Sequence, residues 1–119
     1  MLNGHEAPNP TERILNRVSQ LFDISLADLQ SNRRDARITR ARQIAIYLIK
    51  ELTELSLTDI GRCLGQRSHS AIHYSLQQIS SKLPKDRILS QQIESLKSEL
   101  SLEQHEQPTL IPRPIKVRL

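Results

Sequence analysis

Glycine, cysteine and aromatic residues are scarce in this chain of 119 residues, which has three Gly, one Cys, one Phe, two Tyr and no Trp. A small-molecule active site is usually a concave pocket with apolar and aromatic walls, so this composition argues against an enzyme. The glycines are Gly4, Gly61 and Gly65, a spacing that excludes the Gly-rich phosphate loop of nucleotide-hydrolysing proteins. We therefore predict no catalytic residues, no bound nucleotide and no cofactor.

The single cysteine, Cys63, has no partner for an internal disulfide, as is typical of proteins in a reducing compartment. Its neighbours Ile60 and Leu64 favour a buried position on a helix over a reactive thiol. No apolar run reaches the ~18 residues of a membrane-spanning helix, and the N-terminal segment MLNGHEAPNP lacks the parts of a signal peptide. We therefore predict a cytoplasmic protein with no membrane partner.

Capping signals and apolar spacing predict that the chain is all-α. Asn9 and Pro10 start a first helix, and Ser25 starts a short second one. The residues expected to face inward are Ile14, Val18, Leu21 and Phe22 in the first helix and Leu26 and Leu29 in the second. The polar segment SNRRDAR is predicted to be a loop. A helix from about Thr39 to Glu54 then follows, and it is apolar over most of its circumference, as suits the centre of a bundle.

The next segment has the layout of a helix-turn-helix. Ser56 opens a short helix, residues 65–68 form a turn with Gly65, and a further helix carries the inward stripe Ile72, Leu76 and Ile79. After Pro84, a last helix from about Asp86 to Leu102 has the apolar positions Ile88, Leu89, Ile93, Leu96 and Leu100. We favour packing of that stripe on its own domain over a seam for self-association or a protein partner. Residues 1–8 are predicted to be a disordered arm, 9–102 the domain and 103–119 an extended tail.

Positive charge is clustered rather than spread over the chain, whose net charge is +4. Five arginines, Arg33, Arg34, Arg37, Arg40 and Arg42, face one acid, Asp35, in the same stretch. A loop with Arg33 and Arg34 can insert an arginine into a DNA minor groove, while the arginines that follow and Gln43 would meet phosphates. A solvated charged surface is the usual alternative, but the position just before a helix-turn-helix favours DNA.

The start of the second motif helix carries the residue types that read base edges in a major groove, which are Arg67, Ser68, His69 and Ser70. The alternative is a serine helix cap followed by a solvated turn. His69 and His73 are spaced as metal ligands could be, but no Cys, Asp or Glu completes a set, so we predict no metal.

The stretch from Arg33 to Ile79, RRDARITRARQIAIYLIKELTELSLTDIGRCLGQRSHSAIHYSLQQI, strongly resembles the C-terminal DNA-binding domain of the bacterial replication initiator DnaA. That family shows an arginine loop and the patterns RQxAxYLxxELT, SLxxIGxxFG and GRDHTTVxHA, which here read RQIAIYLIKELT, SLTDIGRCLG and GQRSHSAIHYS. The resemblance covers residues 11–80. It implies a compact helical bundle with an embedded helix-turn-helix, as in DnaA domain IV or the Trp repressor, that binds a double-stranded, DnaA-box-like site.

The resemblance also implies a role for the matched positions. Arg34 would enter the minor groove, while Arg42, Gln43 and Lys50 would hold the phosphate backbone, with Leu57 and Thr58 lying against it. The major groove would be read by Arg67, Ser68, His69, Ser70 and Ala71.

The base-reading turn departs from the family pattern at three positions. The family's aspartate after the motif arginine is Ser68 here, and its two threonines are Ser70 and Ala71. A carboxylate accepts from cytosine and a threonine methyl contacts thymine, so each lost contact would cost ~1–3 kcal/mol of discrimination. We therefore expect a site that is shifted or relaxed relative to the usual DnaA box.

The sequence contains no counterpart of the initiator's ATPase module, without which an ATP-driven filament cannot form. Met1 and the proline-rich tail favour a stand-alone protein over an excised fragment. We predict a regulator of transcription or replication in the bacterial cytoplasm and nucleoid. The alternatives are the excised domain of a full initiator and a protein-interaction module derived from it.

Overall fold

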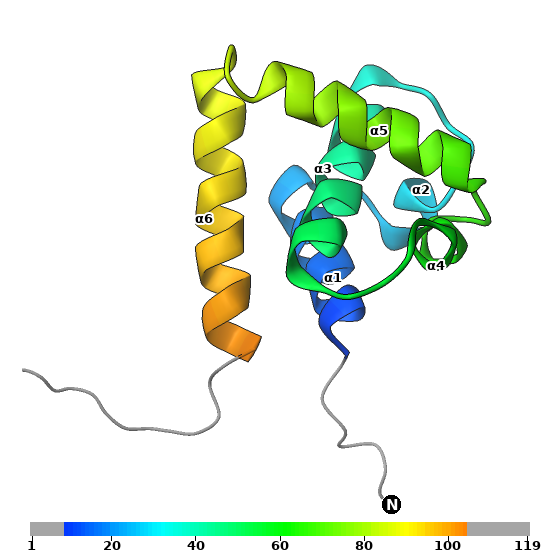
Figure 1. Cartoon of the computed structure of the whole chain (residues 1–119), viewed down its shortest axis with the longest axis horizontal. Helices are drawn as coiled ribbons and strands as arrows, with labels where there is room; N and C mark the ends of the chain where they lie inside the picture. Colours follow the sequence, from blue (N-terminus) through cyan, green and yellow to red (C-terminus); the bar gives the residue numbers. More distant parts are fainter. Residues whose placement is uncertain (1–8, 105–119) are drawn as a thin grey trace, which may run out of the picture.

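The computed structural model describes residues 9–104, and within them it has helices and no strand. The helices are α1 (Pro10–Phe22), α2 (Leu26–Leu29), α3 (Ala36–Leu52), α4 (Leu57–Cys63), α5 (His69–Lys82) and α6 (Arg87–Gln104). The prediction of an all-α fold is confirmed (Figure 1). The predicted arm at 1–8 and residues 105–119 of the predicted tail lie outside the described residues, while 103 and 104 still belong to α6.

Most of the helices begin at a side chain that accepts a hydrogen bond from the backbone three residues further on. The bonds run from Glu12 N to Asn9 (2.8 Å), Asp28 N to Ser25 (3.0 Å), Asp59 N to Ser56 (3.1 Å), Ala71 N to Ser68 (3.2 Å) and Leu89 N to Asp86 (3.0 Å). Such a cap satisfies an N–H group that the first helical turn leaves free and contributes about 1 kcal/mol. The predicted starts at Asn9, Ser25 and Ser56 are confirmed.

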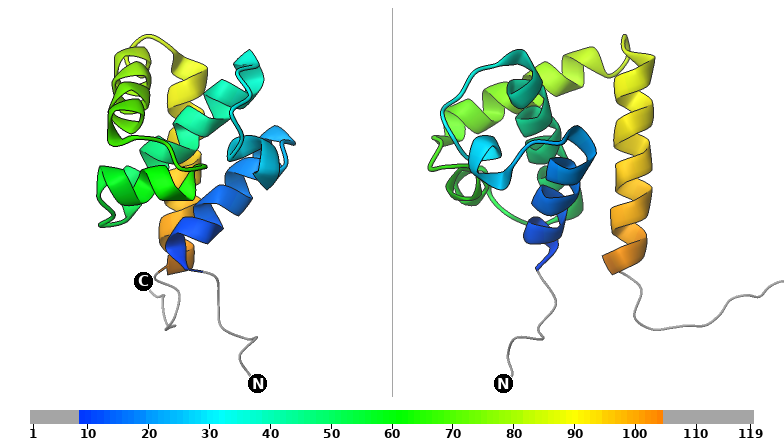
Figure 2. Two further views of the ribbon diagram at one scale, coloured as in Figure 1. Left: turned by 90° about the vertical axis from the view of Figure 1, so that its right-hand side faces the viewer. Right: turned by 180° about the vertical axis from the view of Figure 1, so that it is seen from behind.

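The central helix is α3, which packs against α1, α2, α4, α5 and α6. Its fully buried residues are Ala41, Ile44, Ala45, Ile46, Leu48 and Ile49. In Figure 1 α5 crosses the upper end of α3 and α6 runs alongside, an arrangement that Figure 2 shows from two further sides. The helix begins at Ala36, earlier than the predicted Thr39, because Ile38 is buried and continues the apolar face into the arginine-rich segment.

Three apolar residues that were expected to face inward are exposed instead. Leu21 is 42% exposed, Leu26 is 38% exposed and Ile88 is 66% exposed. In α1 the buried face is formed by Ile14, Leu15 and Val18, so the stripe is rotated away from Leu21. Sequence spacing alone does not separate these exposed positions from the buried ones, because neighbouring apolar residues fit the same helical period.

The apolar stripe of α6 packs within its own domain, which is the alternative that we favoured over a seam. Leu89, Ile93, Leu96 and Leu100 are at most 2% exposed, and α6 packs against α3 and α1. An ion pair between Lys97 and Glu51 of α3 (3.6 Å) adds to this contact. These four side chains are therefore not available to a second copy or a protein partner, whereas Ile88 at the start of α6 remains exposed.

Candidate nucleic-acid interface

The helix-turn-helix is closed by a tight contact between α4 and the turn that follows it. The Arg67 N–H donates to the Gly61 carbonyl (2.9 Å), and a Cβ placed on Gly61 would lie 2.0 Å from the Arg67 carbonyl oxygen. The turn itself has two residues in the left-handed region, Gly65 (φ 85°) and Gln66 (φ 66°). Because glycine alone adopts that conformation without strain and has no Cβ, Gly61 and Gly65 fix how α5 leaves α4.

The first turn of α5 presents polar side chains to solvent. Ser68, His69 and Ser70 are exposed, while Ala71 is half-buried. The Ser68 oxygen accepts from the Ala71 N–H, so the alternative of a serine cap is correct as far as it goes. A capping hydroxyl keeps its own proton, which can still be donated to a partner outside the protein. The cap and the base-reading role are therefore compatible in one residue.

Arg67 points back toward the arginine-rich loop. Its guanidinium donates from Nη2 to the Ser31 carbonyl (2.6 Å), and its Nε is buried with no partner among the described residues. Burial lowers the pKa of Arg67, and the nearby charge of Arg34 lowers it further. The predicted contact of Arg67 with guanine stays a prediction, and it would require the side chain to leave Ser31.

Arg42 lies inside the protein instead of on its basic surface. It is 6% exposed, and it donates from Nε to the Leu29 carbonyl (2.9 Å) and from Nη2 to the carbonyls of Asp28 (3.2 Å) and Ser31 (3.1 Å). Burial lowers its pKa, followed by the repulsion of Arg67. The predicted phosphate contact is thus limited to Nη1, the one guanidinium nitrogen without a partner in the described residues. The main task of Arg42 is to hold the end of α2 and the loop.

The neighbouring Gln43 is also buried. Its burial disagrees with the prediction of an open contact between Gln43 and the DNA backbone. Both side chains still line a hollow between the loop and α5, so each keeps an edge that faces outward. Their burial was missed because the sequence shows only that they are polar. Three carbonyl groups at the end of α2 and in the loop supply the partners that make a buried arginine acceptable.

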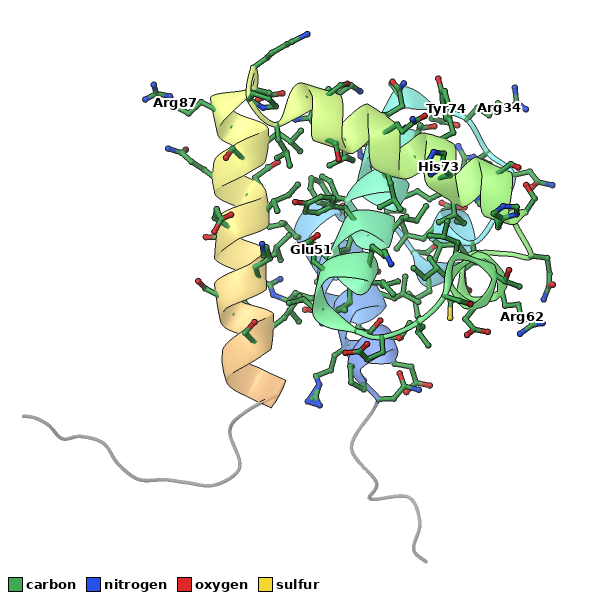
Figure 3. The ribbon with its side chains drawn as sticks, in the orientation of Figure 1. Arg34, Glu51, Arg62, His73, Tyr74 and Arg87 are labelled. Carbon is green, nitrogen blue, oxygen red and sulfur yellow. The ribbon has the colours of Figure 1, made fainter. Side chains whose placement is uncertain are left out.

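The structure distinguishes the two arginines that were predicted to enter the minor groove. Arg33 is paired with Asp35 (3.0 Å) and Asp28 (3.4 Å), and its pKa is raised mainly by Asp35. Arg34 is exposed and forms no hydrogen bond or ion pair with any described residue. In Figure 3 it projects from the loop at the edge of the molecule, beyond the first part of α5. Arg34 is therefore the arginine available to a ligand.

The remaining predicted positions differ in their partners and in their exposure. Arg37 donates to the Asp23 carbonyl (2.8 Å), and Arg40 forms an ion pair with Asp86 (3.4 Å). Exposed ion pairs contribute about 0–1 kcal/mol, so a phosphate can replace the acid at little cost. Lys50 and Thr58 are exposed, whereas Leu57 is half-buried against the core.

Sequence reasoning missed Tyr74, which is 59% exposed on α5. It lines the hollow together with Arg34 and Arg67, and Figure 3 shows Tyr74 and Arg34 on the same edge of the molecule. A signal was available, because Tyr74 follows Ser70 by one helical turn and so shares its face of α5. Asn32 and Ser75 line the hollow as well and were also missed.

No cluster of three potential metal ligands occurs among residues 9–101, and His69 and His73 are both exposed. Separately, no described helix has the length and apolar content needed to span a lipid bilayer.

Cys63 is half-buried, and burial raises the pKa of its thiol, with a further contribution from Asp59. A raised pKa keeps the thiol protonated as the pH increases, and the thiolate is the reactive form. We expect iodoacetamide at pH 8 to alkylate Cys63 of the folded protein several-fold more slowly than that of the urea-unfolded chain, as measured by mass spectrometry. Equal rates would contradict the buried thiol.

Comparisons with known proteins agree with this arrangement. A family model described as bacterial dnaA protein helix-turn-helix matches residues 11–79. The chromosomal replication initiator protein DnaA of Rhodopseudomonas palustris (strain TIE-1) is 42% identical over 83 residues, which cover 70% of this chain and 18% of that protein. The protein of the same name from Wolbachia pipientis wMel is 40% identical over 97 residues, which cover 82% and 21%. The chain thus spans about a fifth of the length of these relatives.

A crystal structure of a DNA replication initiation factor superposes with a TM-score of 0.70 over 77% of this chain and 28% of the other, at 20% sequence identity. That likeness shows a shared fold. The family match covers more than half of the chain, including the arginine-rich loop, α3 and the helix-turn-helix as far as Ile79 of α5. The chain belongs to the bacterial dnaA protein helix-turn-helix family, which implies that it binds DNA.

Proposed function

We propose that this chain is a sequence-specific, double-stranded DNA-binding protein that regulates transcription or replication in the bacterial nucleoid by occupying DnaA-box-like sites. The first turn of α5 reads the major groove, and Arg34 enters the adjacent minor groove. The observation that carries the proposal is the pair of hydrogen bonds from Arg42 and Arg67 to the same Ser31 carbonyl. They fix the loop of Arg34 relative to the start of α5, as simultaneous reading of two grooves requires.

In this proposal, further basic and polar residues hold the phosphate backbone beside the two grooves. Arg37 and Arg40 exchange their intramolecular partners for phosphates, and Lys50 and Thr58 are open to solvent. Leu57, Arg42 and Gln43 contribute only the edges that remain accessible. No catalytic step is part of the proposal, because a helix-turn-helix acts by binding.

The site that is read differs from the usual box at the position facing Ser68. Its oxygen accepts from the Ala71 N–H and its proton is left to donate, whereas an aspartate in the same place can only accept. A donor can meet guanine O6 or N7, thymine O4 or adenine N7 in the major groove, whereas cytosine presents only a donor there. An acceptor favours cytosine or adenine. Because the hydroxyl keeps a second lone pair and can also accept, Ser68 relaxes the preference that the family's aspartate gives.

Selection of bound duplexes from a random pool tests this function directly. We expect one short asymmetric motif to be enriched, with affinity that falls steeply as salt increases, because phosphate contacts release counterions. The Ser68→Asp variant should shift the enriched base at one position of that motif. Absence of duplex binding at low salt, or binding without any enriched motif, would overturn the proposal.

Replacing Arg34 should weaken binding more than replacing its neighbour Arg33. Arg34→Ala removes an unpaired guanidinium, with a loss of about 10- to 100-fold in affinity, as expected for a charged hydrogen bond. Arg33→Ala is the matched control, because Asp28 and Asp35 already neutralise Arg33. Both affinities are measured by fluorescence anisotropy on the selected duplex. Equal losses would show that the loop contributes charge alone.

A further inference from the structure

A hollow of about 690 Å³ separates the arginine-rich loop from α5. Its walls are formed by Asn32, Arg34, Thr39, Arg42, Gln43, Arg67, Ala71, Tyr74 and Ser75. Three guanidinium groups thus meet there from the loop, from α3 and from the turn before α5. None of the described residues that line the hollow is an aspartate or glutamate. Acids are found nearby, but Asp28 and Asp35 are paired with Arg33.

The guanidinium groups of this hollow lack the anion that would balance them. Arg42 and Arg67 repel each other, and Arg67 and Arg34 do so as well, which lowers the pKa of both Arg42 and Arg67 after the larger effect of burial. The buried Nε of Arg67 has no acceptor among the described residues. An unsatisfied buried donor costs free energy, and like charges in a partly desolvated site repel. An oxyanion in the hollow would balance the like charges.

The proposed function, on which this inference rests, also says which oxyanion it is. With Arg34 in a minor groove and α5 in the adjacent major groove, one sugar–phosphate strand separates the two. That strand has to pass between the loop and α5, where the hollow lies. The occupant is therefore a phosphodiester of the DNA backbone and not a free metabolite.

Tyr74 forms the α5 side of the hollow. Its phenol is exposed, has no hydrogen-bond partner among the described residues, and lies on the edge that also carries Arg34 (Figure 3). A phenol O–H can donate to a phosphate oxygen, while the ring offers an apolar face to the deoxyribose. We propose that the hollow binds the phosphodiester between the two grooves and that Tyr74 is a positioning residue that donates to it from α5.

A phosphate-by-phosphate substitution tests this assignment. The probes are copies of the selected duplex, each with a methylphosphonate at a different single linkage. A methylphosphonate is uncharged and lacks one acceptor oxygen of the phosphate. We expect wild-type affinity to fall most, on the order of 10-fold, at one linkage between the two grooves. Tyr74→Phe should lose about 3- to 10-fold on the unmodified duplex and little or nothing further when that linkage is a methylphosphonate.

The control is Gln77→Ala, since Gln77 is exposed on α5 and does not line the hollow. It should keep wild-type affinity and wild-type sensitivity to every linkage, and thermal melting confirms that all variants fold. Two results would overturn the inference. One is a loss from Tyr74→Phe that adds to the loss from the methylphosphonate at every linkage, and the other is an affinity of Tyr74→Phe for the unmodified duplex equal to that of the wild type. Failure of the wild-type protein to bind any duplex would instead overturn the proposed function.

Discussion

Replacing Arg42 by methionine is expected to lower the free energy of unfolding by about 3 kcal/mol. The buried guanidinium makes three hydrogen bonds to carbonyl groups of Leu29, Asp28 and Ser31, and methionine fills a similar volume without a donor. The carbonyls at the end of α2 would then be buried without partners. A chemical denaturation curve measures the loss directly, and the thermal midpoint should fall by roughly 10–20 °C.

Arg40→Met is the matched control, because both arginines lie on α3 and only their surroundings differ. Arg40 forms an ion pair with Asp86 at the surface (3.4 Å), where both side chains are more than a third exposed (41% and 35%). Such a pair contributes about 0–1 kcal/mol. Arg42→Lys should recover only part of the stability, since one ammonium cannot span the positions of Nε and Nη2. A stable Arg42→Met variant that merely binds DNA less well would contradict the anchoring role and support a direct phosphate contact.

The same variant bears on DNA binding through the loop. Once Arg42 no longer holds Ser31, Arg67 is the one arginine that still donates to the Ser31 carbonyl. We therefore expect Arg42→Met, at a temperature where it is folded, to bind all duplexes more weakly and to discriminate less between them. The two effects come from one cause, because Arg34 and the start of α5 would no longer keep a constant spacing.

The helices and the motif could be predicted from the sequence because their signals are local. A capping serine, the apolar residues that follow it and the glycine of the turn are all close in sequence, so Ser56 and Gly65 identified the helix-turn-helix without tertiary information. The family patterns extended this to the arginine loop. The start of α3 at Ala36 was missed because three arginines obscured the buried position of Ile38.

The candidate site was predicted less completely, because accessibility depends on contacts between distant residues. Arg34 and Arg42 are both arginines in a basic stretch, yet one is free and the other is buried against carbonyls of α2 and the loop. That difference arises from the packing of α2 on α3, which no local pattern encodes. Tyr74 was missed because its role depends on a residue distant in sequence. Its exposed ring gains a proposed function only because the arginine-rich loop lies across from α5.

Gly61→Ala is expected to destabilise the protein by about 3 kcal/mol, although alanine is ordinarily the better helix residue by about 1 kcal/mol. The reason is the approach of the turn to α4, which leaves 2.0 Å between an added Cβ and the Arg67 carbonyl oxygen. The obstacle is backbone and cannot rotate away. To accept the methyl group, the turn must move, and the hydrogen bond from Arg67 N to Gly61 O (2.9 Å) would be lost with it.

The neighbouring exposed residue supplies the control for this prediction. Arg62→Ala in the same helix removes only a surface pair with Asp59 (3.0 Å) and should change stability by less than about 1 kcal/mol. A Gly61→Ala variant that melts at or above the wild-type temperature would show that the turn can relax freely.

The folded fraction of Gly61→Ala should also lose sequence preference in duplex selection, because a displaced turn carries Ser68 and the start of α5 away from the loop of Arg34. Stability and specificity are thus coupled through one glycine, at the point where the turn lies against α4.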